Sequence, residues 1–210
     1  MREYHKIETL FERDTDGSKK LIPGLWRNET VKFLAENEWV FTEKIDGTNI
    51  RVHWDGHKVT FGGRTERAQI PVKLVAFLND TFGGETNAQL FEQKFGDMEV
   101  TLYGEGYGPG IQSGGAYRSD VSFILFDVLV GNLWLRRESV EAIAVAFGID
   151  AVPVLGKGTL AEAVDIVKKA PKSTIGTAPM EGIVARPAVE VLDRCGKRVI
   201  VKIKVRDFKE

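Results

Sequence analysis

The strongest constraint on the fold of this chain is a strand–turn–strand pattern in its first third. Residues 39–45 (WVFTEKI) and 49–54 (NIRVHW) are rich in β-branched and aromatic side chains, and Asp55-Gly56 precedes the run HKVTFGG. An Asp-Gly pair between two β-rich runs is a strong hairpin signal. The pattern therefore predicts antiparallel strands early in the chain.

The rest of the chain mixes helical and strand patterns. A capping-box pair, Thr159 and Glu162, marks one helix start, and Asn28 is a candidate cap for another. Strands follow one another through turns and do not alternate regularly with helices, which predicts an α+β fold with antiparallel β-sheets flanked by helices. Helices are expected over 28–38, 71–82, 86–95, 138–148 and 159–170, and further strands over 98–106, 122–130, 182–187 and 198–205.

Length and composition exclude several classes of protein. A chain of 210 residues predicts one domain, and 43% apolar with 28% charged residues is ordinary for a soluble protein. No apolar run approaches the roughly 18 residues of a membrane span, and the N-terminal residues carry no apolar signal core. The single cysteine, Cys195, permits no intrachain disulfide, so we expect a cytoplasmic protein without membrane contact.

The formal net charge of −1 argues against a protein that coats nucleic acid by bulk charge. The average conceals a basic segment, however. Residues 194–210 contain seven basic and two acidic residues, a local charge of +5. Within them Val201 and Ile203 are expected on one strand face, and Lys202 and Lys204 on the other. Such a strand is either a solvated edge or a phosphate-binding element.

Common phosphate-binding loops are absent from the sequence. Six of the twelve residues in 104–115 are glycine, yet no Gly-x-Gly-x-x-Gly pattern occurs there, and Gly156-Lys157 lacks the rest of a P-loop. What remains is a set of dispersed groups. A lysine beside a glycine turn is a candidate nucleophile once its amine is neutral, and carboxylates beside lysines suit phosphoryl chemistry. Each group alone has an ordinary structural explanation as a turn, a surface acid or a core phenyl ring. The groups are Lys44-Ile45-Asp46-Gly47, Glu105, Phe126-Asp127, Glu181-Gly182 and Lys202-x-Lys204.

The order of these groups is more specific than any member. TEKIDGTNIR, YGEGYG, FILFDV, MEGIVAR and VIVKIKV resemble the successive motifs I, III, IIIa, IV and V of covalent nucleotidyl transferases. That superfamily contains ATP-dependent DNA and RNA ligases and mRNA capping enzymes. The Gly-Thr-Asn extension of motif I resembles the RNA ligase 2-like branch, and the resemblance runs from about residue 39 to the end. It implies an ATP-grasp-like nucleotidyl-transferase (adenylation) domain.

The resemblance also implies a reaction. The lysine of motif I attacks the α-phosphate of ATP, the resulting lysine-bound AMP passes to a 5′-phosphate end of RNA, and a 3′-hydroxyl displaces it. The implied cofactors are ATP and Mg²⁺ or Mn²⁺, the partner is RNA, and we expect a monomer; the process could be RNA repair, editing or circularisation. The implied catalytic residues are Lys44, Glu181, Lys202 and Lys204. The implied nucleotide-binding residues are these four with Glu43, Ile45, Asn49, Arg64, Glu105 and Phe126, and the implied metal ligands are Asp46, Glu105 and Glu181.

Several alternatives remain open at this level. Only six residues follow Lys204, which leads us to expect a single nucleotidyl-transferase domain over 1–210 without a C-terminal OB-fold or helical domain. A DNA ligase, a capping-type guanylyltransferase that uses GTP, and a non-catalytic nucleotide- or RNA-end-binding module would each share parts of the pattern. The lack of a C-terminal domain and the Gly-Thr-Asn extension count against the first two.

Overall fold

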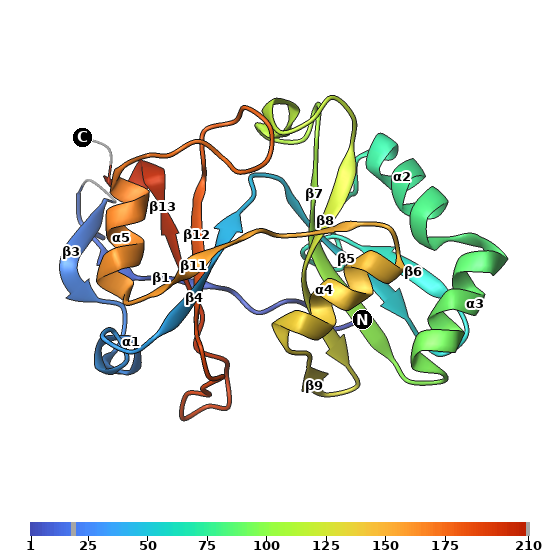
Figure 1. Ribbon diagram of the computed structural model, residues 1–210, viewed down its shortest axis with the longest axis horizontal. Helices are drawn as coiled ribbons and strands as arrows, with labels where there is room; N and C mark the ends of the chain where they lie inside the picture. The colour runs from blue at the N-terminus through green and yellow to red at the C-terminus, as the bar shows by residue number, and fades with distance from the viewer. Residues whose placement is uncertain (18–19, 209–210) are drawn as a thin grey trace. The chain divides into compact units, whose positions relative to one another are not determined.

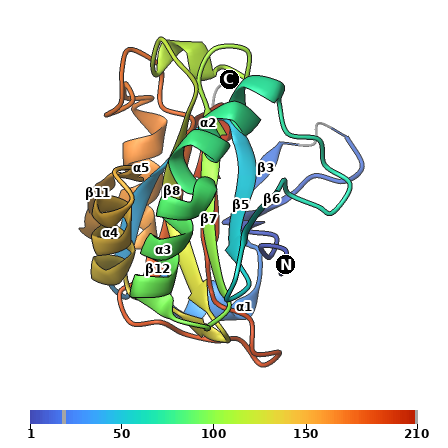
Figure 2. The same ribbon diagram turned by 90° about the vertical axis from the view of Figure 1, so that its right-hand side faces the viewer.

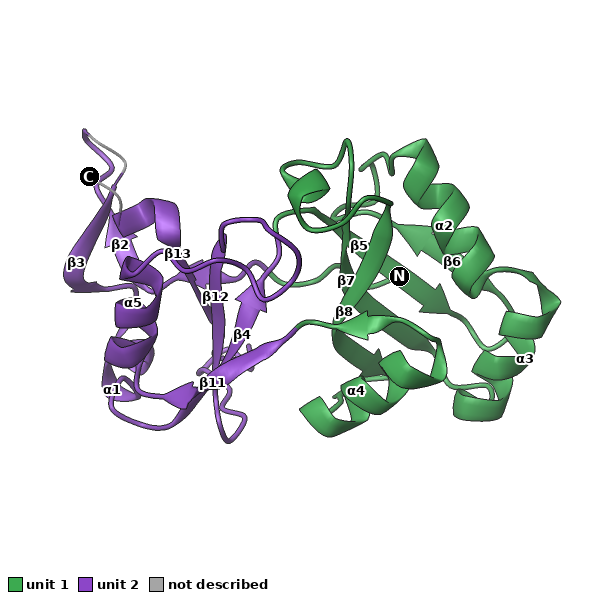
Figure 3. Cartoon of the chain, turned by 45° about the horizontal axis from the view of Figure 1, so that its top comes forward, with its two compact units in different colours: residues 1–5, 46–152 green, residues 6–45, 153–210 purple. Residues whose placement is uncertain are grey.

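The computed structural model describes residues 1–17 and 20–208, which are arranged as two compact units (Figure 3). Unit 1 consists of Met1–His5 and Asp46–Val152, and unit 2 consists of Lys6–Ile45 and Pro153–Glu210. The boundary between Ile45 and Asp46 falls inside the Lys-Ile-Asp-Gly segment, so the two units share this motif.

Unit 1 is built on a largely antiparallel sheet in the order β10-β8-β7-β5-β6. The hairpin expected at Asp55-Gly56 is confirmed, because β5 pairs antiparallel with β6 and the Asp55 carboxylate accepts the N–H groups of His57 (3.0 Å) and Lys58 (2.9 Å). Only β10 pairs in parallel, with β8. The strands are β5 (Thr48–Trp54), β6 (Val59–Gly62), β7 (Val100–Tyr107), β8 (Ser122–Val130), β9 (Leu133–Trp134) and β10 (Asp150–Ala151).

Helices cover one face of this sheet and the first five residues cover the other. Figures 1 and 2 show α2 (Val72–Phe82) and α3 (Gly84–Phe95) along one side. There Phe91 packs 4.5 Å, centroid to centroid, from Phe147, which follows α4 (Arg137–Ala146). Successive residues of a strand point to opposite faces. Accordingly Leu102 lies in this helix-covered core, whereas Tyr103 contacts Tyr4 at 5.0 Å.

Unit 2 contains a five-stranded sheet in the order β1-β13-β12-β4-β11, and α5 packs on β12 and β13. The basic strand β13 lies between β1 and β12, so its interpretation as a solvated edge is wrong. A separate pair, β2 and β3, completes the unit. The elements are β1 (Glu8–Thr9), β2 (Phe11–Arg13), β3 (Leu21–Trp26), α1 (Glu29–Phe33), β4 (Trp39–Lys44), β11 (Val154–Gly158), α5 (Leu160–Lys168), β12 (Gly182–Pro187) and β13 (Val201–Lys204).

Two expected elements are shorter than the sequence patterns suggested. The helix expected over 28–38 ends at Phe33, although Asn28 caps it as expected. The carbonyls of Leu34 and Ala35 instead accept tertiary hydrogen bonds, from the Trp39 indole (2.8 Å) and from the Leu160 N–H (3.0 Å). Likewise the strand expected over 198–205 covers only Val201–Lys204, because Arg198 pairs in an isolated bridge with Leu192 and Val205–Phe208 form a 3₁₀ turn. Within the part of the chain that the structure describes, no helix has the length and apolar character needed to cross a membrane.

Candidate active site

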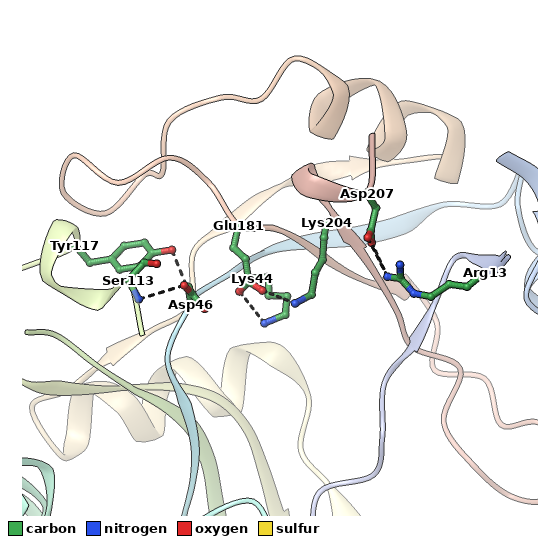
Figure 4. Close-up of polar contacts among 8 residues, drawn as sticks. All are labelled: Arg13, Lys44, Asp46, Ser113, Tyr117, Glu181, Lys204 and Asp207. Atoms are coloured by element: carbon green, nitrogen blue, oxygen red, sulfur yellow. Dashed lines mark hydrogen bonds and ion pairs between the residues drawn. The ribbon is translucent and has the colours of Figure 1, made fainter. Parts of the chain in front are cut away.

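Three charged side chains meet where neighbouring strands of unit 2 begin and end (Figure 4). Lys44 closes β4, Lys204 closes β13, and Glu181 immediately precedes β12, whose first residue is in register with both lysines. The Lys44 ammonium donates to Glu181 Oε2 at 2.8 Å, and the Lys204 ammonium donates to Glu181 Oε1 at 2.6 Å. Sheet pairing therefore brings together groups that are 137 residues apart in sequence.

This trio of Lys44, Glu181 and Lys204 is only partly open to solvent. The three side chains are 23%, 16% and 15% exposed, respectively. Two cations and one carboxylate leave a net charge of +1 in a partly desolvated position, where electrostatic interactions are stronger than in bulk water. The arrangement suits an anionic ligand such as a phosphate chain.

Glu43 points away from this trio, since neighbouring strand residues face opposite sides. Its carboxylate is 1% exposed and accepts hydrogen bonds from the hydroxyl of Ser173, the N–H of Thr174 (2.9 Å) and the hydroxyl of Thr174 (2.5 Å). Ser173 and Thr174 belong to a turn over residues 171–180, closed by the Met180 N–H on the Pro171 carbonyl at 3.0 Å. That turn leads directly into Glu181.

The remaining expected residues of unit 2 are close to the trio in sequence: Ile45 follows Lys44, and Lys202 precedes Lys204 by two residues. Ile45 is 3% exposed and packs in the interior. Lys202 lies in β13 two residues before Lys204, hence on the same face, and is half-buried. Just beyond the strand, Asp207 accepts two hydrogen bonds from Arg13 Nη2, at 2.9 and 3.0 Å. This pair fastens the end of β13 to β2, which supports the position of Lys204.

In unit 1, Asp46 is tied to the glycine-rich loop over residues 108–117. The Asp46 N–H donates to the Tyr117 hydroxyl at 3.2 Å, and Asp46 Oδ2 accepts the Ser113 N–H at 3.3 Å (Figure 4). Next to it, a Cβ on Gly47 would lie 2.3 Å from the Gly106 carbonyl oxygen. Glycine at this position is therefore required by the close approach of the two backbones, which explains the glycine of the motif.

Asn49 and Glu105 are direct partners across β5 and β7. Asn49 Oδ1 is buried and has no hydrogen-bond partner among the residues that the structure describes. Buried polar atoms are normally satisfied, so an orphaned acceptor at this position is consistent with a group that meets a ligand. Arg64 is exposed and follows β6 in a bend.

Phe126 occupies a bulge in β8, because Tyr103 pairs with Asp127 and Gly104 pairs with Leu125. A bulge leaves one residue unpaired and re-aims its side chain. The Phe126 ring is half-buried and meets the Tyr4 ring edge-on at 5.1 Å. The Tyr4 hydroxyl donates to Asp127 Oδ2 at 2.7 Å, which provides the partner that the fully buried acid requires.

Several residues that support the site carry no signal in the sequence. Ser173 and Thr174 lie in a polar stretch without a recognisable motif, and Tyr4 lies 123 residues from its partner Asp127. Ser113 falls inside the glycine-rich segment 104–115, whose glycine spacing matches no common phosphate-binding loop, and Tyr117 lies two residues beyond it. An inward-facing acid such as Glu43 in a strand does predict that partners exist, but it does not say which residues provide them.

The site thus consists of a lysine at the end of an interior strand, β4, with a carboxylate and a second lysine beside it. The RNA ligase family model matches residues 37–204, so the chain belongs to the RNA ligase family. The expected resemblance and the α+β fold class are thereby confirmed.

Solved structures of RNA ligases from Naegleria gruberi have a similar fold. A mutant RNA ligase with ATP and Mn matches with a TM-score of 0.64 and 18% identity, over 95% of this chain and 59% of the other. RNA ligase with PPi matches with a TM-score of 0.62 and 17% identity, over 96% and 61%. A mutant of RNA ligase R4a in its apo form gives 0.63 and 16%, over 84% and 52%. The chain thus spans about half to three fifths of the length of these relatives.

Proposed function

We propose that this chain is an ATP-dependent RNA ligase in which Lys44 is the nucleophile. The observation that carries the proposal is the pairing of Glu181 with both Lys44 and Lys204 at the ends of adjacent strands. Membership of the RNA ligase family, and the match to a relative described with ATP and Mn, support the choice of reaction and nucleotide.

The first step needs a neutral amine and an electrophilic phosphorus. Once the Lys44 ammonium has released a proton to solvent, the lone pair of the neutral amine forms a nitrogen–phosphorus bond to the α-phosphate, and a second proton leaves the nitrogen for solvent as the phosphoramide forms. The bond between the α-phosphorus and the bridging oxygen breaks, and pyrophosphate leaves with the electron pair. Lys204 and Lys202 neutralise the phosphate oxygens during this transfer, and Glu181 holds the two lysines of the trio apart in a fixed geometry.

The AMP then passes to RNA. A 5′-phosphate oxygen attacks the phosphorus of the lysine-bound AMP and displaces the amine, which leaves a 5′-adenylated end. A 3′-hydroxyl attacks the 5′-phosphate of that end and releases AMP. We assign Asn49 and Arg64 to contacts with phosphates at the polynucleotide ends, Phe126 to stacking on adenine and Glu105 to the ribose hydroxyls.

A divalent cation fits this site if the nucleotide carries it. Among residues 1–17 and 20–208, no group of three or more His, Cys, Asp or Glu side chains could hold a metal ion. Mg²⁺ is commonly held by one or two carboxylates, water and substrate phosphates, which matches the single acid Glu181 of the trio and leaves Asp46 and Glu105 as further candidates. When bound, such an ion would neutralise charge on the phosphate oxygens.

The decisive experiment is labelling of the protein with α-³²P-ATP, α-³²P-GTP or adenylate-labelled NAD, followed by denaturing electrophoresis. We expect label from ATP in the wild type, none in Lys44→Ala, and wild-type labelling in the matched control Lys157→Ala, which alters an exposed lysine of the same sheet. Label from GTP alone would identify a capping-type enzyme. Label on Lys44→Ala would refute the assignment of the nucleophile, and no label from any nucleotide would favour a binding module.

A sealing assay determines which polynucleotide the enzyme joins. The substrates are nicked duplex RNA, an RNA–DNA hybrid, nicked DNA and single-stranded RNA. The proposal expects sealing of at least one substrate with an RNA 3′-hydroxyl end. Sealing of nicked DNA alone would replace RNA ligase with DNA ligase as the function.

A further inference from the structure

A fully buried arginine lies two residues beyond Asn49 in β5. The Arg51 side chain is 0% exposed, although its ion-pair partner Glu66 is 71% exposed. Arginine is almost never fully buried without partners, because removing its charge from water is costly. Arg51 therefore has a structural task that outweighs the cost of its burial, and its partners indicate what that task is.

The guanidinium joins three segments of unit 1. Arg51 Nε donates to the Gly63 carbonyl at 2.7 Å, and Nη1 donates to the Met1 carbonyl at 3.2 Å and to Glu66 Oε1 at 3.1 Å. The guanidinium also lies close to Gly62, where an added Cβ would be 3.1 Å from Nη2 and 3.3 Å from Nε. A planar group with five fixed donors can bridge these acceptors simultaneously, whereas the single ammonium of lysine cannot.

These anchors lie on both sides of Arg64. Gly63 precedes it, and Glu66 follows it by two residues, with the Glu66 N–H also donating to Glu3 Oε1 at 3.3 Å. Arg64 itself is exposed and lies in a bend outside any helix or strand. An exposed residue in a bend keeps one conformation only if the flanking backbone is fixed. Here the hydrogen bonds from the buried Arg51 to Gly63 and Glu66 fix the segment on both sides of Arg64.

We propose that Arg51 is a positioning residue that holds the 62–66 segment so that Arg64 meets the phosphate of the RNA end. The proposal rests on the function proposed above, in which Arg64 contacts the polynucleotide. Because Arg51 is fully buried, the proposal gives it no contact of its own with RNA, although its Nη2 has no hydrogen-bond partner among the described residues. Arg51 keeps Arg64 in its binding position before RNA arrives. A displaced Arg64 would stabilise the transition state of sealing less well, and sealing would be slower.

The test compares two rates in each variant: transfer of AMP from ATP to Lys44, and sealing of a nicked RNA that already carries a 5′-adenylate. We expect Arg51→Met to lower the ratio of sealing to AMP transfer about tenfold or more, in the same direction as Arg64→Ala. The double variant Arg51→Met/Arg64→Ala should seal no more slowly than Arg64→Ala alone, because both changes remove the same contact between Arg64 and RNA.

Arg137→Met is the matched control, because Arg137 is also largely buried in unit 1 and donates to a backbone carbonyl, that of Val152. It should lower the melting temperature and leave the ratio unchanged. A merely structural role for Arg51 predicts the same outcome for Arg51→Met, so an unchanged ratio, or losses that add in the double variant, would overturn the proposal.

Two further measurements keep the test decisive. If Arg51→Met does not fold, the ratio is measured on Arg51→Lys, which keeps the charge but loses the bridge. A lowered ratio there supports the proposal and an unchanged ratio overturns it. A wild type that neither takes label from ATP nor seals RNA would refute the proposed function instead, so the two failures are distinguishable.

Discussion

The most informative single substitution outside the trio is Glu43→Gln. The Glu43 carboxylate is 1% exposed and accepts three hydrogen bonds from Ser173 and Thr174. Glutamine has nearly the same shape, but one of its two terminal atoms donates hydrogen bonds. If the amide nitrogen takes the Oε2 position, it faces the Thr174 N–H, and if it takes the Oε1 position, the Ser173 hydroxyl must turn to accept from it. In either case the bonds to a charged carboxylate are lost.

The magnitude follows from the number of bonds. A hydrogen bond to a charged group contributes roughly 1.5–3 kcal/mol, and a buried unsatisfied group costs about 1–3 kcal/mol. We therefore expect Glu43→Gln to lower the free energy of unfolding by about 2–4 kcal/mol. For a chain of this size 1 kcal/mol corresponds to about 2–4 °C, so a loss of 3 kcal/mol lowers Tm by about 6–12 °C.

Thermal and urea unfolding followed by circular dichroism measure this change. Glu36→Gln is the control, because it makes the same chemical change at an exposed position of unit 2 and should alter stability by less than about 0.5 kcal/mol. Equal stability of Glu43→Gln and wild type would refute the reasoning. A raised KM for ATP with unchanged stability would instead support the nucleotide-binding role that the sequence motif implies for Glu43.

Three other predictions can be checked with single variants. Lys204→Ala removes the second cation on Glu181 and should slow labelling by ATP about tenfold or more, since about 1.4 kcal/mol equals one factor of ten in rate; a wild-type rate would contradict this. Tyr4→Phe removes only the hydroxyl that donates to buried Asp127 and should cost roughly 1.5–3 kcal/mol in a urea titration. Burial lowers the pKa of His53, so the unfolded chain takes up this proton first as pH falls below about 6.5. The free energy of unfolding should decline over that range and level off below the folded-state pKa, and His53→Gln should flatten the profile.

The elements that the sequence predicts correctly are those determined by residues close together in the chain. The strand over 122–130 and the strand over 182–187 occur with the expected bounds, and the capping box at Thr159 and Glu162 is present. Each of these depends on neighbours within a few residues. The strand pattern also placed Lys202 and Lys204 on one face, which requires only the two-residue period.

Elements whose existence depends on distant partners were not foreseen. The two-residue strand β1 is recognisable only from its pairing with β13, and β10 only from its pairing with β8. For the same reason the sequence could name Glu181 and Lys44 as site residues but could not state that they form an ion pair. Arg51 was absent from the expected site because its role depends on the backbone of Met1 and Gly63.

The interruption of unit 2 by residues 46–152 has a consequence for the order in which the chain can fold. The sheet of unit 1 joins strands that are close in sequence, such as β5 with β6 and β7 with β8, so it can form soon after residue 152 leaves the ribosome. By contrast the sheet of unit 2 is completed late, because β4 can pair with β11 first but its other neighbour is β12, where Ala185 pairs with Phe41. A nascent chain stalled before residue 182 therefore carries Lys44 without the paired strands that bring Glu181 and Lys204 beside it, and the trio can assemble only after residue 204 has been made.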